Sequence, residues 1–443
     1  MKSSVLRTGL PNDASGCGWY ETLPSPGPAA TLRGEQRFDW AIVGAGVAGL
    51  AAARRLATLK PDAEIAVIDA QRVGFGTAGR NSGFMIDLPH ALTTDSYTGQ
   101  EADDRRQIKL NRAAIDYMRE TVEAHGIECD WSEQGKIHAA VEEDGVKALA
   151  SFRRGLDALG EPYTPMDDGE LASSLGTSFY RDGLHTPGTV LVQPAALMRG
   201  LAQTLPGNVT VYESSPVRSI SCPPGCVTLE GEGGRLIADR AVLTNNAFAA
   251  DMKAMRRRLI PVFTYASMTR VLTTEEAATL GGTESWGLIP ANPVGTTARR
   301  LRSGRIVIRN SFTYNRRLAV SRTAMNRIRR RHRASFRERF PMLPEVDFEY
   351  TWGGVLCLSR NAGAVFGEIA PRVFAAICQN GLGLARGTIS GKLIAEYAAG
   401  QDSDLLAEML RFPQASRNPP DPLLRVGVEG NIRWREWRAG KEL

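Results

Sequence analysis

The sequence predicts an α/β fold, α+β overall, with one parallel sheet wound with helices and a second, mostly antiparallel sheet. A β-α-β unit stands near the N-terminus: the apolar run FDWAIVGAG (38–46), the alanine-rich run VAGLAAARRLATL (47–59) and the apolar run AEIAVIDA (63–70). Strand-like patterns then dominate residues 260–315, and a strand, a glycine turn and a helix follow at 373–400. The parallel unit and the strand-rich middle segment predict two different sheets.

Length, composition and cysteine content limit the class of protein. The chain has 443 residues, of which 43% are hydrophobic and 23% charged, as is typical of a globular protein with two or three compact units. No window approaches 18 apolar residues and the first 36 residues lack the apolar core of a secretion signal, so we expect a cytoplasmic protein. The 6 cysteines are too few for a disulfide framework, and no Cys/His spacing predicts a metal site.

The remaining elements follow from periodicity and from glycine positions. A helix predicted over 103–124 ends at Gly126, which favours a helix C-cap. A strand at 135–141 and a helix at 194–205 come next. Residues 209–246 then read as strands joined by a glycine-rich hairpin.

Arginines concentrate in one segment near the C-terminus, residues 316–339. Apolar and aromatic residues recur there at three- and four-residue spacing, which predicts an amphipathic helix with one buried stripe and a solvated arginine face. Because the net charge of +6 is modest for this length, we do not expect nucleic-acid binding. The predicted stripe consists of Met325, Ile328, His332, Phe336 and Phe340.

The first β-α-β unit carries a dinucleotide fingerprint. Gly44, Gly46 and Gly49 form G-x-G-x-x-G between a strand and a helix, which allows a tight turn, close approach of a pyrophosphate and close helix packing. The phosphates are expected at the helix N-terminus. Asp69 ends the next strand, where a carboxylate accepts hydrogen bonds from ribose hydroxyls. The pattern predicts a Rossmann-like domain that binds NAD or FAD.

Further motifs give the chain a resemblance to a known family. The segment GFGTAGRNSGF (74–84) and the turn N-G-x-G (380–383) follow the fingerprint in the order found in FAD-dependent amine and amino-acid oxidoreductases. The chain resembles the D-amino-acid oxidase, glycine oxidase and sarcosine oxidase superfamily over residues 19–400. It is most similar to the γ-glutamylputrescine oxidoreductase-like branch, whose members also carry a leader like WYETLPSP (19–26).

This resemblance implies a Rossmann-like FAD-binding domain and a mostly antiparallel substrate domain. The FAD-binding domain is expected to combine residues 37–110, 185–250 and 350–400. The substrate domain is expected to combine residues 111–184 and 251–349, between a leader (1–36) and a C-terminal tail (401–443).

The resemblance also implies which residues lie against FAD. Bare backbone in the 74–84 segment is expected to follow the flavin ring, with Arg80 offsetting anionic charge unless it is paired elsewhere. Many relatives have serine where this chain has Ala78, so one hydroxyl contact is lost. The residues expected to bind FAD are Gly44, Gly46, Val47, Ala48, Gly49, Asp69, Ala70, Gly79, Arg80, Asn81, Ser82, Gly83, Val217, Asn245, Asn380, Gly381, Leu382 and Gly383.

The reaction implied by the family is oxidation of a primary or secondary amine, either a polyamine derivative or an amino acid. Hydride passes from the amine-bearing carbon to flavin, water hydrolyses the imine, and oxygen (giving hydrogen peroxide) or another acceptor reoxidises the flavin. Some sarcosine oxidases attach flavin covalently through a cysteine near this point, which makes Cys357 a candidate, but the register differs by about one residue. We therefore expect non-covalent FAD and no metal.

The substrate side is less legible. Arg309, in SGRIVIRNSF, is either a clamp for an acidic substrate group or part of a structural ion pair. Asn310, His90 and Tyr265 are the other candidate pocket residues, and Met85 is a possible wall. No lysine occurs between residues 254 and 391, whereas some relatives use one there to assist oxygen.

Two other functions remain open. A flavin enzyme acting on a modified tRNA base would suit a basic chain, but no RNA-binding module precedes the fold. An amine dehydrogenase delivering electrons to a membrane acceptor would suit the tail NIRWREWRAGKEL (431–443), where Trp434 and Trp437 stand among basic residues. A tail that folds back on its own domain, or packs between subunits, is the commoner arrangement, and we do not expect membrane association. The oligomeric state is not predicted.

Overall fold

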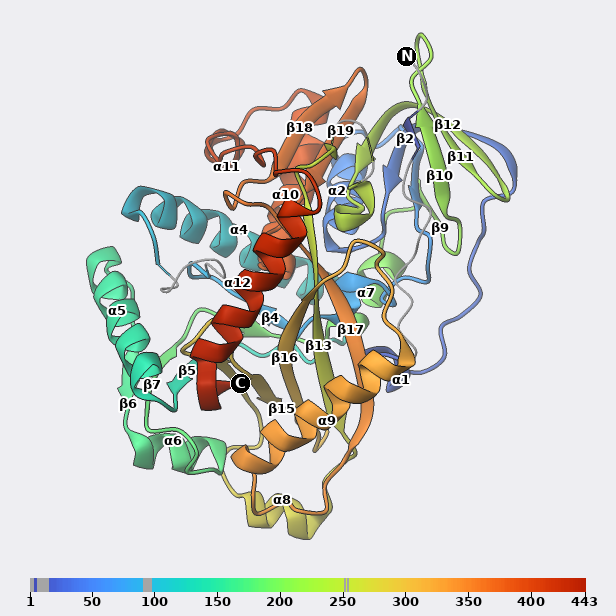
Figure 1. Cartoon of the computed structure of the whole chain (residues 1–443). Helices are drawn as coiled ribbons and strands as arrows, with labels where there is room; N and C mark the ends of the chain where they lie inside the picture. Colours follow the sequence, from blue (N-terminus) through green and yellow to red (C-terminus); the bar gives the residue numbers. More distant parts are fainter. Residues whose placement is uncertain (1–3, 6–15, 91–97, 251, 253–254) are drawn as a thin grey trace.

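Two large sheets organise the chain. The computed structural model describes residues 4–5, 16–90, 98–250, 252 and 255–443, so the predicted leader lies partly outside the described residues. The first sheet occupies the upper part of Figure 1 and the second sheet the middle and lower part. One sheet has a parallel centre and the other is almost entirely antiparallel, which confirms the predicted fold class.

The parallel centre of the first sheet has the strand order β19-β12-β2-β3-β9. Its strands end in runs of Ile, Val and Ala that are buried on both faces, as expected where helices and other chain cover a parallel sheet. These strands are β2 (Gly34–Val43), β3 (Ile65–Ile68), β9 (Val209–Tyr212), β12 (Gly234–Leu243) and β19 (Val373–Ile377). The antiparallel additions are β1 (Ser4–Val5), β10 (Val217–Ser221), β11 (Val227–Gly231) and β18 (Val365–Ala370).

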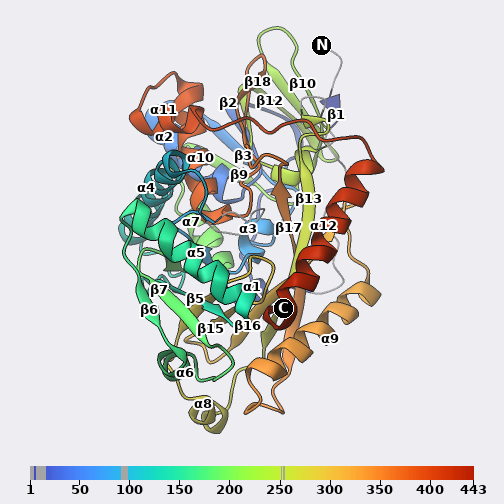
Figure 2. The ribbon, with the colours of Figure 1, turned by 60° about the vertical axis from the view of Figure 1, so that its left-hand side comes forward.

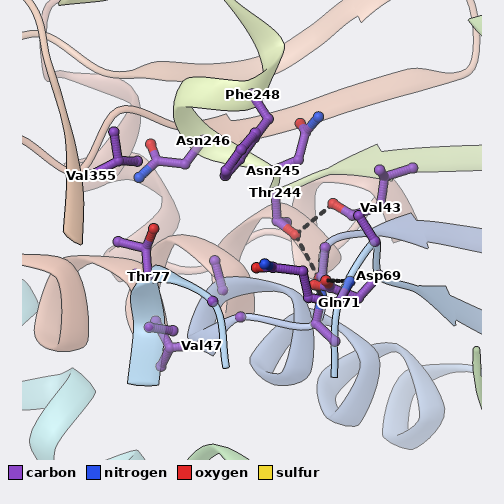
Figure 3. A pocket seen from close by; sticks show the side chains of 18 of the residues that line it. Val43, Val47, Asp69, Gln71, Thr77, Thr244, Asn245, Asn246, Phe248 and Val355 are labelled. Atoms are coloured by element: carbon purple, nitrogen blue, oxygen red, sulfur yellow. Dashed lines mark hydrogen bonds between the residues drawn. The ribbon is translucent and has the colours of Figure 1, made fainter. Parts of the chain in front are cut away.

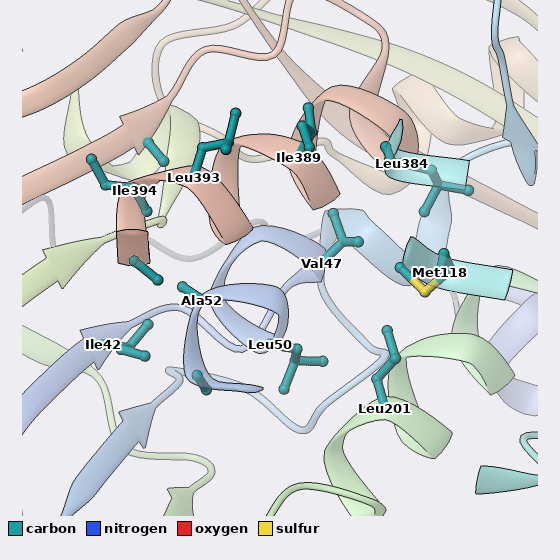
Figure 4. Close-up of a cluster of buried hydrophobic side chains, with 14 of the residues drawn as sticks. Ile42, Val47, Leu50, Ala52, Met118, Leu201, Leu384, Ile389, Leu393 and Ile394 are labelled. Carbon is teal, nitrogen blue, oxygen red and sulfur yellow. The ribbon is translucent and has the colours of Figure 1, made fainter. Parts of the chain in front are cut away.

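Helices bury one face of this sheet in the core drawn in Figure 4. Helices α2 and α10 pack closely, because a Cβ on Gly391 would stand 2.1 Å from the Ala48 carbonyl oxygen. Ile42 from β2 and Met118 from α4 extend the same cluster. The helices that contribute are α2 (Val47–Leu59), α4 (Glu101–His125), α7 (Pro194–Gln203), α10 (Gly383–Ala399) and α11 (Asp404–Leu410).

The second sheet has the order β17-β13-β16-β15-β14-β5-β7-β6, in which only β14 and β5 run parallel. Its long strands β17, β13 and β16 stand at one end of this order and cross the middle of Figure 1. The strands are β5 (Lys136–Ala140), β6 (Thr164–Met166), β7 (Asp182–Thr186), β13 (Ile260–Thr269), β14 (Trp286–Pro290), β15 (Thr297–Arg300), β16 (Ile306–Tyr314) and β17 (Phe348–Leu358).

Helices also surround the second sheet, and short elements join the two halves. The helices are α5 (Glu143–Leu159), α6 (Asp168–Leu175), α8 (Thr274–Leu280), α9 (Arg322–Arg339) and α12 (Leu423–Ala439). The short elements are α1 (Gly18–Glu21), α3 (Thr77–Arg80), β4 (Phe84–Met85), β8 (Val190–Leu191) and the 3₁₀ turns η1 (Asn246–Ala249) and η3 (Gly440–Glu442). The β4–β8 pair forms a small separate sheet.

The arginine-rich segment folds as predicted. Helix α9 buries Met325, Ile328, His332 and Phe336 against the second sheet, and Phe340 is buried at its C-cap. Most of its arginines are exposed or half-buried on the opposite side. The amphipathic helix is therefore confirmed.

Two predicted domain boundaries fall inside single elements. The boundary at 110/111 cuts helix α4, which packs as one unit with α10 and α11 beside the first sheet. The boundary at 350 cuts strand β17, which pairs with β13 of the second sheet along its whole length. Apolar periodicity identifies a strand or helix but does not say which sheet it joins, and this is why the boundaries differ.

One buried arginine of the second sheet, Arg299, binds two segments that precede it in the sequence, the loop before β4 and the residue after β8. The Arg299 guanidinium, on β15, donates to the carbonyl oxygens of Ser82, Gly83 and Val192 at 2.9, 3.2 and 2.8 Å. The guanidinium also lies over the Trp19 ring. Burial lowers the pKa of Arg299 to about 10, so it stays charged at neutral pH. The cation thus holds the loop before β4 by hydrogen bonds to main-chain oxygens, and it also lies 5.6 Å from the Phe84 ring centroid.

Replacing Arg299 with methionine should loosen this loop. Three buried carbonyl groups lose a charged donor, and the free energy of unfolding should fall by about 2 kcal/mol. Amide hydrogen exchange across residues 77–86 should accelerate. Arg300→Met is the matched control, since Arg300 is the next buried arginine but donates to Gly281 and Thr283 instead. Unchanged exchange at 77–86 in Arg299→Met would contradict this role for Arg299.

Candidate functional site

The first turn after β2 forms one end of a long cavity. Gly44 has a φ of +107°, and a Cβ on Gly49 would stand 1.8 Å from the Gly44 carbonyl oxygen, so both positions require glycine. The Thr244 hydroxyl donates to the Val43 and Gly44 carbonyls at 2.9 and 3.0 Å (Figure 3). Helix α2 begins after Gly46 and aims its N-terminal N–H groups at the cavity, where they favour an anion.

Asp69 follows β3 beside this turn. Its carboxylate accepts from the Ala45 N–H at 2.7 Å and from the Gln71 N–H at 2.8 Å (Figure 3). Burial raises the pKa of the Asp69 carboxyl, although the two N–H donors oppose the shift. Ala70 and Val217 lie on the same cavity wall. The carboxylate is thus fixed by backbone donors where the fingerprint predicts it.

The 74–83 loop runs along the cavity as bare backbone, and Gly79, Ala78 and Asn81 line it. A Cβ on Gly79 would stand 1.8 Å from the Gly74 carbonyl oxygen. Arg80 takes a different direction from the one expected of it. Its guanidinium donates to the Phe75 and Gly353 carbonyls and lies 4.6 Å from the Phe75 ring centroid. Arg80 therefore braces the loop and borders a second cavity instead of this one.

The other end of the cavity lies where β19 leads into α10. Asn380, Gly381 and Gly383 line it, whereas Leu382 is the buried N-cap of α10. The Asn380 side chain donates to the carbonyls of Ala362 and Gly363, which fixes the turn. The turn thus leaves main-chain groups at the cavity wall.

The described residues fit an extended dinucleotide. Asn245 borders the cavity, and its buried amide oxygen has no hydrogen-bond donor among the described residues, which suits a polar ligand group. The N-terminus of α2 offers backbone N–H groups for phosphates. The Asp69 carboxylate lies near that helix, and main-chain groups of the 380–383 turn lie at the other end of the cavity. Several further residues of the cavity wall belong to no sequence motif and were not predicted: Gln71, Arg72, Phe248 and Val355.

A second cavity adjoins the first and shares part of its wall. Arg309, Tyr265 and His90 line it together, as the sequence predicts, with Trp352 from β17. The Tyr265 hydroxyl is 2.6 Å from the Thr313 hydroxyl. Burial, then the charges of Lys136 and Arg309, lower the pKa of His90 to about 3, so its imidazole is neutral. The shared wall consists of Thr77, Asn81, Val355, Leu356, Gly381 and Gly383.

Asn310 does not join this cavity. It is fully buried, and its side-chain amide donates to the Thr296 hydroxyl and to the Leu443 carbonyl oxygen, each at 2.9 Å. Successive residues of a strand point to opposite faces, so Arg309 on one face puts Asn310 on the other. Met85 is also fully buried outside both cavities.

A buried lysine behind the second cavity was missed. Lys136 on β5 donates to the Thr186 and Thr189 hydroxyls at 2.9 and 3.1 Å, and Thr189 in turn donates to Asp87 at 3.1 Å. Burial lowers the pKa of Lys136 to about 8. The spacing of Lys136 and His138 in GKIHAAV puts both on one face of an apolar strand, and this signal could have found them.

Cys357 lies on β17 and lines the first cavity. Its neighbour is Cys378, whose sulfur is 3.6 Å from the Cys357 carbonyl oxygen. The contact with Cys378, followed by burial, raises the pKa of the Cys357 thiol well above its usual range. A protonated thiol is a poor nucleophile.

The described residues carry neither a metal-ligand cluster nor a helix suited to span a bilayer. Within the described ranges, no three His, Cys, Asp or Glu side chains gather as metal ligands. Among the same residues, no helix has the length and apolar content that a bilayer span needs.

Comparisons with known proteins agree with this geometry. The chain is 28% identical to a probable oxidoreductase OrdL of Rhizobium meliloti, covering 90% of this chain and 92% of that protein. It is 24% identical to the γ-glutamylputrescine oxidoreductase of Escherichia coli, covering 87% and 90%. Its fold matches a crystal structure of glycine oxidase from Geobacillus kaustophilus with a TM-score of 0.70 and 20% identity, covering 87% of this chain and all of that one. The model of the FAD-dependent oxidoreductase family, DAO, matches residues 39–397, so the chain belongs to this family and uses FAD.

Proposed function

We propose that the protein oxidises a primary or secondary amine that also carries an acidic group, an amino acid or a polyamine derivative of that kind. The observation that carries this proposal is the second cavity, which meets the FAD cavity at Asn81, Val355 and Gly381 and contains Arg309. Bound FAD supplies the acceptor for a hydride from the amine-bearing carbon. The imine is then hydrolysed by water.

The first cavity would hold FAD, and the second cavity would hold the substrate. Helix α2 and Asp69 would hold the pyrophosphate and a ribose, and the 77–81 loop and the 380–383 turn would border the flavin ring. Trp352, Tyr265 and Ala266 restrict the second cavity and keep bulk water from the reacting carbon. Two of the similar proteins are named as a γ-glutamylputrescine oxidoreductase and a glycine oxidase, and both names support an amine substrate.

The charges around the second cavity favour a neutral amine. Arg309 lines the cavity and buried Lys136 lies behind it, and both disfavour a substrate ammonium. His90, with a pKa of about 3, is too weak a base to remove that proton at neutral pH. The electrostatic field therefore takes the place of a dedicated base, and kcat/KM should rise as the substrate ammonium deprotonates.

The experiment for this function is an anaerobic visible spectrum of the holoprotein with pooled amines and amino acids. Amine oxidation predicts that the flavin absorbance bleaches, and splitting the pool then identifies the substrate. Air readmission separates reaction with oxygen from dependence on another acceptor. A bound flavin that no amine or amino acid reduces would refute the proposed substrate class while leaving the family unchanged.

Arg309→Met tests the carboxylate clamp. Loss of a half-buried charged donor to a substrate carboxylate should raise KM about tenfold to 100-fold, with a smaller effect on kcat. Arg309→Lys should recover part of the loss, because it restores charge without the bidentate fork. The control substrate is the corresponding amine without its acidic group, whose KM should not rise. Equal KM values for wild type and Arg309→Met would leave Arg309 a structural role only.

Acid precipitation tests how the cofactor is held. The protonated Cys357 thiol predicts that all flavin is released into the supernatant. Cys357→Ser should bind flavin to the same extent as wild type. Flavin that stays with the precipitate in wild type, but not in Cys357→Ser, would establish a covalent link instead.

A further inference from the structure

The C-terminal helix α12 has two apolar faces, and only one of them is packed. Its inner face lies against β16, where Glu436 accepts from the Phe312 N–H at 3.2 Å. The same carboxylate pairs with Arg331 of α9 at 3.0 Å. Helices α9 and α12 therefore lie side by side over one face of the second sheet (Figures 1 and 2). This is the Asn310 face of β16, away from the substrate cavity.

The outer face of α12 carries a stripe of exposed apolar side chains. Leu423, Val426, Trp434 and Trp437 are 65%, 69%, 47% and 78% exposed. Their spacing of three, eight and three residues puts them on one side of the helix, with Gly430 in the middle. Of the seven large apolar residues that are exposed in the described parts of the chain, four belong to this stripe. Folding of the tail onto its own domain, expected from the sequence, leaves both tryptophans outward.

Basic residues border the stripe. Arg433 is exposed on one side of it, and Arg438 lies on the other with its guanidinium 5.0 Å from the Trp434 ring centroid. Helix α9, directly beside α12, adds its own outward arginines. The α9–α12 face is defined here as the α12 stripe with Arg433, Arg438 and the exposed arginines of α9, which are Arg322, Arg327, Arg330 and Arg337.

We propose that the α9–α12 face docks the protein on the surface of an anionic lipid bilayer. Tryptophan side chains prefer the interface between lipid and water, and arginines are attracted to anionic headgroups within a Debye length. A helix with an apolar stripe and basic borders lies in the plane of that interface without spanning it. The proposed amine oxidation makes no use of this face, so the docking surface is an additional property.

A second copy of the chain fits this face less well. A symmetric pair would set the arginine-rich α9–α12 face against its own image, and like charges would then approach one another. An anionic bilayer meets the same arginines with opposite charge. Charge complementarity therefore favours lipid over self-association.

The test is flotation of the full-length holoprotein with vesicles. Phosphatidylcholine vesicles with about one-third phosphatidylglycerol should carry the protein upward at low salt, and raised salt or pure phosphatidylcholine should weaken this. Trp434→Ser combined with Trp437→Ser should lower the vesicle partition coefficient about tenfold or more. Both side chains are exposed, so amine turnover in solution should not change.

A matched control separates the stripe from general apolar exposure. Val271 and Leu410 are each 49% exposed and lie outside the α9–α12 face, so Val271→Ser with Leu410→Ser should float like wild type. Vesicles with brominated acyl chains should quench tryptophan fluorescence. Trp434 and Trp437 are the exposed tryptophans of the described residues, so quenching reports on the stripe.

Three results would overturn the proposal. One is absence of flotation with anionic vesicles, and another is flotation that the double tryptophan variant leaves unchanged. The third is a concentration-dependent dimer that the same variant abolishes, without any lipid binding, which would assign the face to a second copy. None of these results depends on which amine is oxidised, so failure of docking and failure of the proposed function are distinguishable.

Discussion

The contact between Gly44 and Gly49 is the constraint on which both cavities depend. Because no Cβ fits between the Gly49 Cα and the Gly44 carbonyl, the first turn of α2 lies directly on the end of β2. This position aims the N-terminus of α2 at the FAD cavity and brings α2 against α10, where Gly391 allows an equally close approach to Ala48. The turn before α10 then forms the opposite end of the cavity. Two close glycine contacts thus hold α2 between β2 and α10.

The 74–83 loop lies between the two cavities and is held from both sides. Arg80 braces it from within, through the Phe75 and Gly353 carbonyls. Arg299 holds it from the second sheet, through Ser82 and Gly83. A charged donor buried among carbonyl groups is costly to desolvate, as the lowered pKa of Arg299 indicates, but each bond it makes is charge-assisted. Both arginines therefore restrict the movement of the part of this loop that lines the two cavities.

That the fingerprint, Asp69 and parts of the 74–84 and 380–383 segments line one cavity was predictable, because each depends on local backbone requirements that the sequence displays directly. Contacts between distant segments were not. Nothing near Arg299 in the sequence indicates that its partners stand some hundred to two hundred residues earlier. Arg309 and Asn310 were grouped as neighbours, although strand alternation separates them onto opposite faces. The outward direction of Trp434 and Trp437 could not be predicted either, because it depends on which face of α12 packs against β16.

The bonds from Arg299 end on main-chain oxygens, and this has an evolutionary consequence. Ser82 and Val192 supply carbonyl groups to Arg299, whereas Gly83 must remain glycine, because a Cβ there would stand 2.1 Å from the Arg299 guanidinium. Substitutions at Ser82, which lines the second cavity, can therefore accumulate while its carbonyl group keeps the hydrogen bond to Arg299. New substrate preferences become accessible by single mutations that keep the loop in place.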